Sequence, residues 1–389
     1  MRQSKDQDKI LSFMSLLQSY AKKKDIYNGS ALHADLIEKR LLEKSPYLAS
    51  ALISMYAKCG AVKKAREVLE ELPIRNVVLW NALISGYAQQ GKAHEAFGCF
   101  ENMQREGISP DAITFICILK ACGKIGAIDI GKHIEKETAC RCLLKKSIAL
   151  GNAFVDMYAK CGMVENARKV LEELPTRDVV SWNVIISGYT EQGQGHEALD
   201  CFERMVSEGL SPDTISFICI LKACGSVKAI EKGRQIHDEI LSRGLLEKDI
   251  VLGTALVDMY AKCGMIEKAR ETLLDLPVRD VVSWSAIITG CAHQGQAREA
   301  LNCFEQMLSE GITPDIVTFA CILKACGSTR ELDKGELFHK EIVTRGMHQK
   351  DVMLGTALVD MYSKCGVLAK AKQVLQELSC QNAVSWNAL

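Results

Sequence analysis

The sequence has little that would mark its function by composition alone. Its 389 residues include only 7 prolines, and aromatic residues make up 6% of the chain. The net charge is zero, because 48 basic residues balance 48 acidic ones. A strongly basic chain is the simplest sign of nucleic-acid binding. Any such activity therefore has to depend on the positions of particular side chains.

Longer features are scarce as well. No apolar run reaches the roughly 18 residues that a membrane span needs, so we expect no membrane partner. The N-terminal segment MRQSKDQDKI lacks the apolar stretch of a signal peptide, and its two aspartates make it a poor transit peptide. Few prolines and no low-complexity tract argue against disorder.

Cysteine, in contrast, is abundant. There are 17 cysteines, and 13 of them recur at four repeat positions, as Cys122, Cys224 and Cys326 do. Free cysteine packs as a small apolar residue, and such regular spacing suits a core. We therefore expect core cysteines without disulfides, in a reducing compartment.

The chain repeats itself every 102 residues, as the block MYAKCG shows by ending at Gly60, Gly162 and Gly264. Each unit divides into three related motifs of 35, 36 and 31 residues. In the motif 179–213, two apolar stripes with helical spacing flank a glycine turn. Each motif is thus predicted to be a helical hairpin, and hairpins of this kind must stack to bury their apolar faces.

The segments WNALISGYAQQGKAHEAFGCFENMQREGISPD (80–111) and LVDMYAKCGMIEKAR (256–270) resemble pentatricopeptide repeats of the plant PLS subclass. That resemblance implies an all-α fold, a right-handed superhelical α-solenoid of helix-turn-helix repeats. After an N-terminal remnant at 1–9, eleven motifs fill residues 10–382, and a truncated P motif occupies 383–389. L motifs are 10–45, 112–147, 214–249 and 316–351; S motifs are 46–76, 148–178, 250–280 and 352–382; P motifs are 77–111, 179–213 and 281–315.

In the P and S motifs the fifth and last residues are always small and polar, but their identities change between copies. Amide, hydroxyl and carboxylate groups can distinguish the Watson–Crick edge of a base, so we predict that each pair reads one base of single-stranded RNA. A terminal aspartate could also cap the next helix, and the two roles can coexist. The pairs are Ser50 with Asn76, Asn81 with Asp111, Asn152 with Asp178, Asn183 with Asp213, Thr254 with Asp280, Ser285 with Asp315, and Thr356 with Asn382.

The resemblance also implies a pairing preference. Asn with Asp favours U and then C, Thr or Ser with Asp favours G, and Thr or Ser with Asn favours A. Ile116, Ile218 and Ala320 stand at the fifth position of L motifs and cannot read a base edge, so those bases stay open. The predicted target is 5′-AUnUUnGGnA-3′.

Two further sets of side chains are assigned by resemblance. The second residue of the P motifs is Val78, Val180 or Val282; it would sandwich the base, although a valine there could equally be core. Lysines recur in the S motifs and would contact phosphates, which would make the affinity salt-dependent; alternatively, they are only solvated. These lysines are Lys58, Lys160, Lys262 and Lys364.

Catalytic and metal-binding motifs are missing. H-x-E occurs at His237 and His339, but zinc deaminases also need P-C-x-x-C, and the chain has no C-x-x-C. We expect these histidines to lie at the surface, and we expect no zinc site at Cys140 and Cys142. No P-loop, Rossmann glycines or Ser/His/Asp set appears, so neither a cofactor nor enzyme activity is expected.

The resemblance implies sequence-specific RNA binding in a mitochondrion or chloroplast, in the editing or processing of transcripts. Editing-factor proteins are candidate partners, and no small-molecule substrate is expected. Because the sequence stops inside a P motif, we interpret it as a fragment without the C-terminal E/DYW extension. The alternative is a protein-binding helical-repeat scaffold of the tetratricopeptide kind, whose concave face would carry large or charged residues.

Overall fold

The computed structural model describes residues 2–43, 45–140, 143–247, 249–347, 351–377 and 386. Within these ranges the chain forms 22 α-helices and one short 3₁₀ helix, and it contains no strand. The all-α prediction is confirmed. Asn382 and Cys142 lie outside the described residues, as does the segment 383–389 apart from Trp386.

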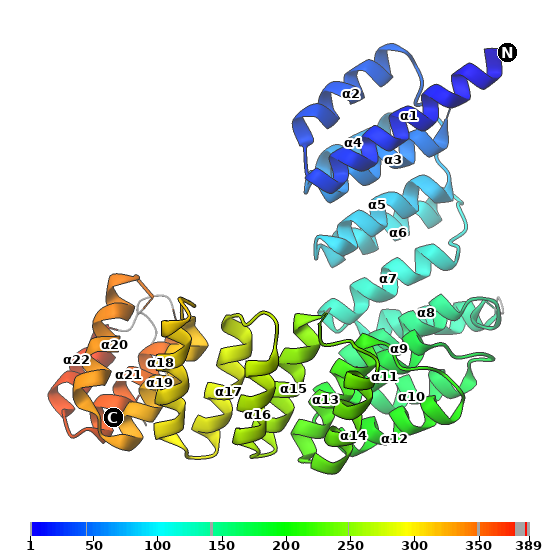
Figure 1. Cartoon of the computed structure of the whole chain (residues 1–389). Helices are drawn as coiled ribbons and strands as arrows, with labels where there is room; N and C mark the ends of the chain where they lie inside the picture. The colour runs from blue at the N-terminus through cyan, green and yellow to red at the C-terminus, as the bar shows by residue number, and fades with distance from the viewer. Residues whose placement is uncertain are drawn as a thin grey trace. The chain divides into compact units, whose positions relative to one another are not determined.

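The helices form two compact units, Met1–Gln192 and Gly193–Leu389. Consecutive helices stack along the chain within each unit (Figure 1). The first unit holds α1 (Arg2–Lys23), α2 (Ile26–Glu38), α3 (Pro46–Lys58), α4 (Val62–Glu71), α5 (Val77–Gln89), α6 (Ala93–Arg105), α7 (Ala112–Ile125), α8 (Ile128–Cys140), η1 (Leu144–Lys146), α9 (Ile148–Lys160), α10 (Val164–Glu173) and α11 (Val179–Glu191). The second holds α12 (Gly195–Ser207), α13 (Thr214–Val227), α14 (Ile230–Ser242), α15 (Ile250–Lys262), α16 (Ile266–Asp275), α17 (Val281–His293), α18 (Ala297–Ser309), α19 (Ile316–Thr329), α20 (Leu332–Thr344), α21 (Val352–Lys364) and α22 (Leu368–Glu377).

The three motif lengths correspond to helix lengths. First helices have 13 residues in the P and S motifs and 14 in the L motifs that begin at α7, α13 and α19. Second helices have 13 residues in P and L motifs but only 10 in S motifs, as in α4 and α10. The S motif is therefore shorter by about one turn of its second helix. Helix α1 differs from the other first helices, because it begins at Arg2 and so includes residues 2–9, which precede the first motif.

The apolar stripes that predicted the helices lie in the core. A helix buries residues spaced three and four apart on one face, and the stripes of α11 and α12 follow this rule. The side chains of Trp182, Ile185, Ile186, Tyr189, Ala198, Cys201, Phe202 and Met205 are all buried. The period of the sequence thus identified the inner faces of these helices correctly.

The first helices of successive motifs pack directly against one another. In the first unit α3 packs on α5, α5 on α7 and α7 on α9; in the second, α13 packs on α15, α15 on α17 and α17 on α19. A second helix packs on the first helix of its own motif and on that of the next, as α6 does with α5 and α7. Each unit therefore has a continuous layer of first helices that the second helices cover on one side.

Several repeated cysteines belong to this core. Cys122, Cys224 and Cys326 are fully buried, which confirms their assignment as small core residues. Burial raises the pKa of these three thiols to about 12. They therefore stay protonated, and a protonated thiol is a poor nucleophile.

A glycine allows neighbouring first helices to approach closely. A Cβ added to Gly86 on α5 would stand 2.4 Å from the Cβ of Ala57 on α3. The same approach recurs between Gly290 and Ala261, also at 2.4 Å. Because real Cβ atoms do not come so close, these positions fix the separation of the helices.

Replacing Gly86 with Ala is expected to lower the free energy of unfolding by about 1–2 kcal/mol, because the added methyl group forces α3 and α5 apart. Thermal unfolding followed by circular dichroism measures the change. Gly98→Ala is the matched control, since no atom lies within 4 Å of a Cβ added there; alanine inside helix α6 should raise stability by about 0.5–1 kcal/mol. Equal destabilisation by both substitutions would contradict this account.

Candidate nucleic-acid interface

The predicted last residues of the P and S motifs are helix caps. Asn76 accepts a hydrogen bond from the backbone N–H of Leu79 at 3.1 Å and caps α5. Asp280 caps α17 in the same way, through the N–H of Ser283 at 2.9 Å. A cap of this kind stabilises a helix by about 1 kcal/mol. The capping role is confirmed for Asn76, Asp111, Asp178, Asp213, Asp280 and Asp315.

Asn81 and Asp111 are brought together by one network. The amide Nδ2 of Asn81 donates to Oδ1 of Asp111 at 2.9 Å. The hydroxyl of Thr114 lies 2.6 Å from Oδ1 of Asn81 and 3.0 Å from Oδ1 of Asp111, and it accepts the N–H of Asp111 at 3.2 Å. Helix α7 therefore begins on a capping box that also holds the fifth residue of the preceding motif.

Two more pairs are joined. Asn152 Nδ2 donates to Oδ1 of Asp178 at 3.3 Å. Partial burial opposes ionisation of Asp178, but hydrogen bonds from Ser181 and Asn152 outweigh it and lower the pKa of its carboxyl group. In the third P motif the link passes through Thr318, whose hydroxyl lies 2.6 Å from Ser285 Oγ and donates to the Asp315 carboxylate at 2.7 Å.

Two pairs, Ser50 with Asn76 and Thr254 with Asp280, are not joined by a hydrogen bond in the described part of the chain. Ser50 and Asn76 are both half-buried, and so are Thr254 and Asp280, without a bond inside either pair. The hydroxyl of Thr356 donates to the carbonyl of Val352 at 2.8 Å. Its predicted partner lies outside the described part of the chain.

The pair Asn183 and Asp213 is divided between the two units, so each residue is described by itself. Asn183 is buried on α11. Oδ1 of Asp213 accepts the N–H of Ser216 at 2.8 Å and caps α13.

Predicted site residues meet in a groove of about 300 Å³ between α3, α5 and the start of α7. Asn81 is 7% exposed in it, whereas Val78 is 40% exposed and Ile113 58% exposed. The groove thus combines recessed polar groups with protruding apolar ones. Its lining is Ser50, Ser54, Ala57, Lys58, Val78, Asn81, Ala82, Ser85, Gly86, Gln89, Asp111 and Ile113.

The second residues of the P motifs are exposed. Val78, Val180 and Val282 expose 40%, 55% and 57% of their surface, so the alternative that they belong to the core is wrong. Exposed apolar side chains also stand at the second position of L and S motifs, which sequence reasoning missed although the register was the same. These are Leu11, Tyr47, Ile113, Ile215, Val251, Val317 and Met353.

The S-motif lysines fall into two groups. Lys58 lines the groove and forms no ion pair with any described residue. Lys160, Lys262 and Lys364 each lie 2.7 Å from the carboxylate of the aspartate four residues earlier. Exposed pairs of this spacing contribute only a few tenths of a kcal/mol, and each places a negative charge beside the lysine.

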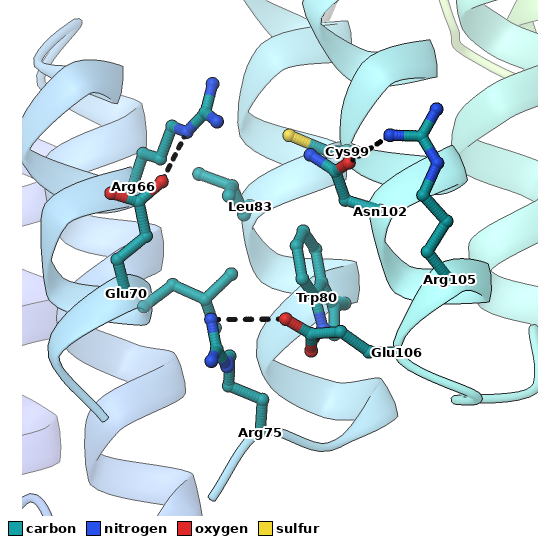
Figure 2. A pocket seen from close by; sticks show the side chains of 10 residues that line it. Arg66, Glu70, Arg75, Trp80, Leu83, Cys99, Asn102, Arg105 and Glu106 are labelled. Carbon is teal, nitrogen blue, oxygen red and sulfur yellow. Dashed lines mark hydrogen bonds and ion pairs between the residues drawn. The ribbon is translucent and has the colours of Figure 1, made fainter. Parts of the chain in front are cut away.

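A second cavity, of about 220 Å³, lies between α4, α5 and α6 (Figure 2). None of the residues predicted to contact RNA lines it. Arg75 pairs with Glu106 at 3.2 Å, and Trp80 Nε1 donates to the same carboxylate at 3.2 Å. These bonds tie α5 to the ends of its neighbours, so we assign this cavity to the packing of the repeat.

The prediction that the H-x-E histidines lie at the surface is wrong for His237. Its imidazole is buried, and a hydrogen bond of 2.9 Å joins its Nδ1 to the hydroxyl of Tyr260 on the next first helix. His339 is half-buried and bonds to Tyr362 in the same way, at 2.9 Å. The two histidines therefore connect neighbouring motifs.

The described residues contain no group of three or more His, Cys, Asp or Glu side chains that could hold a metal ion. Cys140 is exposed at the end of α8. Among the same residues, no helix has both the length and the apolar character needed to cross a membrane.

The fold and the groove define a class: an all-α protein of helical repeats of about 35 residues, in which the P and S motifs carry small polar residues and the groove sets such residues beside exposed apolar ones. The model of the PPR repeat family matches residues 75–124, 177–226 and 279–328, and that of the PPR repeat matches 48–77, 152–179 and 254–281. Together these segments cover more than half of the sequence. The chain belongs to the pentatricopeptide repeat family.

Three relatives from Arabidopsis thaliana illustrate the similarity. A mitochondrial pentatricopeptide repeat-containing protein is 37% identical over 362 residues, which are 93% of this chain and 35% of that protein. A chloroplastic one is 33% identical over 377 residues, 97% of this chain and 60% of that protein. A second mitochondrial one is 34% identical over 364 residues, 93% of this chain and 65% of that protein. The chain thus spans 35% to 65% of the length of these relatives.

Solved structures show the same fold. Pentatricopeptide repeat protein PPR10 in complex with an 18-nt psaJ RNA element matches with a TM-score of 0.71 and 19% identity, over 90% of this chain and 53% of that one. A second structure, of PPR10 from maize, matches with a TM-score of 0.66 and 18% identity, over 97% of this chain and 60% of that one. The predicted helical-repeat solenoid is therefore confirmed.

The buried histidine makes stability depend on pH. Burial, and secondarily Lys268, lowers the pKa of His237, so the unfolded chain binds this proton more tightly than the folded one. The free energy of unfolding should therefore fall as the pH drops below the unfolded-state pKa of about 6.5, and stay level above it.

We expect the loss of stability between pH 7.5 and pH 5 to be smaller in His237→Gln than in the wild type, because glutamine does not titrate. Urea unfolding at both pH values measures it. His196→Gln, at an exposed position on α12, should leave the loss unchanged. If His237→Gln kept the full pH dependence, His237 would not be its source.

Proposed function

We propose that this chain binds single-stranded RNA in a sequence-specific manner and reads one base with each P or S motif. The groove of Asn81 and Asp111 beside the exposed Val78 and Ile113 carries the proposal. A nucleobase has apolar faces and a polar edge. A groove with protruding apolar side chains and recessed amide and carboxylate groups complements both.

Capping leaves part of the Asp111 and Asn76 side chains available for a base. Oδ1 of Asp111 accepts all the hydrogen bonds that the described residues donate to this carboxylate, and Oδ2 accepts none. Asn76 caps through Oδ1 and keeps its Nδ2 amide. The free group is therefore an acceptor in aspartate and a donor in asparagine.

This difference supports the assignment of bases. Guanine and uracil present a ring N–H on the Watson–Crick edge, which a carboxylate oxygen can accept. Adenine presents an unprotonated ring nitrogen, to which an amide can donate. Motifs that end in Asp thus suit G or U, and motifs that end in Asn suit A. The proposed target is 5′-AUnUUnGGnA-3′, with open positions opposite the L motifs.

We further propose that the chain belongs to the plant PLS subclass and acts in a mitochondrion or chloroplast, in the editing or processing of transcripts. The regular order of 35-, 36- and 31-residue motifs supports the subclass, and the names of similar proteins include both organelles. In this proposal the chain acts by binding and not by catalysis, and editing-factor proteins are its expected protein partners.

A protein-binding scaffold is less well supported. Peptide-binding grooves in helical repeats would carry large or charged residues. The groove between α3 and α5 is lined instead by small residues such as Ser50, Ser54, Ala82 and Ser85.

Asp280→Asn should change the preferred base at the seventh position of the target from G to A by about five- to tenfold, because the free acceptor becomes a donor. Competition between two oligoribonucleotides that differ only at this position measures the change. Asparagine also caps helices, so the fold should be kept. Asp249→Asn is the control, because Asp249 also caps a helix but ends an L motif. An unchanged preference in Asp280→Asn would remove this pair from the reading set.

Raising the salt concentration from 50 to 200 mM should weaken RNA binding several-fold, because each phosphate contact releases counterions. Fluorescence anisotropy titrations at a series of salt concentrations measure the slope. A flat response would exclude phosphate contacts by any of the lysines.

A further inference from the structure

The ninth residue of a first helix lies on the same face as the second, because seven residues make almost two helical turns. Ser54 and Ser85, the ninth residues of the motifs that start at α3 and α5, both line the groove. In three L motifs the ninth residue is a lysine, and each of these lysines is exposed. They are Lys120, Lys222 and Lys324, seven residues after the exposed Ile113, Ile215 and Val317.

Half of the lysines on the layer of first helices are already engaged by neighbouring groups. From α3 to α21 these helices carry eight lysines and no arginine. Lys160, Lys262 and Lys364 are paired with aspartates. The ammonium group of Lys124 donates to the carbonyl of Ala88 at 2.7 Å. Lys58, Lys120, Lys222 and Lys324 are left exposed, and none of them forms an ion pair with a described residue.

We propose that Lys120, Lys222 and Lys324 bind phosphate groups of the RNA, so that the L motifs hold the backbone while the P and S motifs read bases. This inference rests on the RNA binding proposed above. It gives a role to motifs whose fifth residues, such as Ile116 and Ile218, cannot bond to a base edge. Phosphate contacts position a nucleic acid without carrying sequence information, and uncompensated cations on the groove-facing side supply them.

The arrangement is periodic. The three lysines are 102 residues apart, which corresponds to one backbone contact for every three motifs. It also explains how a chain without net charge can bind a polyanion. Lys160, Lys262 and Lys364 of the S motifs are paired with aspartates, whereas Lys58 and the three L-motif lysines remain available.

The double variant Lys222→Gln, Lys324→Gln tests the inference in the second unit. The probe is the labelled oligoribonucleotide AUAUUAGGAA, titrated at 50 to 300 mM potassium chloride. We expect affinity at low salt to fall by roughly two- to fivefold per lysine. The slope of log affinity against log salt should become less steep by about 0.7 per lysine, as for other single strands. The preference for G at the seventh position should stay unchanged.

The matched control is Lys340→Gln, Lys372→Gln, which removes the same charge from exposed positions on the second helices α20 and α22. It should leave the salt slope close to that of the wild type. The converse variant, Asp258→Asn with Asp360→Asn, frees Lys262 and Lys364 and should make the slope steeper. Circular dichroism confirms that each variant is folded.

The outcomes separate the two proposals. A wild-type chain that does not bind the probe at any salt concentration overturns both RNA binding and this inference. Wild-type binding with an unchanged slope in the Lys222→Gln, Lys324→Gln variant overturns only the phosphate role. The phosphate role is also overturned if the slope of log affinity against log salt falls equally in that variant and in the second-helix control. Net charge alone would then explain the effect.

Discussion

An aspartate or asparagine side chain caps the first helix after every P or S motif whose last residue the structure describes. The cap fixes the residue at which the helix begins, since its oxygen takes up a backbone N–H that no carbonyl can reach. The same residue ends the preceding motif, so the cap also sets the register between neighbours. In the pair of Asn81 and Asp111, the capping oxygen holds the fifth side chain too. The proposed reading of bases therefore depends on a bond that the fold already requires.

Much of the fold was predictable because it follows local periodicity. Stripes such as Trp182 to Tyr189 identify buried faces, and the repeat length identifies the stacking. The joined pairs, Asn81 with Asp111 and Asn152 with Asp178, were also found from the sequence, because both members vary while the residues around them do not.

Other features depend on contacts that no local pattern contains. The burial of His237 comes from Tyr260, which lies on the next motif. The local sequence also does not show that Val78 is exposed, since a valine on a first helix would suit the core equally well. The aspartate–lysine pairs of the S motifs did have a signal, since a spacing of four residues favours an ion pair on a helix.

The charges of this chain are expected to act on RNA only at short range. With equal numbers of basic and acidic residues, the whole chain exerts little long-range attraction on RNA, so association should not be strongly steered. Affinity would then come from contacts inside the groove: base faces against residues such as Val78 and Ile113, base edges on the polar pairs, and phosphates on a few free lysines. Such a division favours selectivity over tight non-specific binding.

Selection of bound molecules from a random RNA pool tests the central claim most directly, because it assumes no target. The account predicts enrichment of a ten-nucleotide pattern, A-U, U-U, G-G and A, with open positions after the second, fifth and eighth nucleotides. Enrichment of an unrelated pattern, or of none, would contradict the reading of one base by each P or S motif.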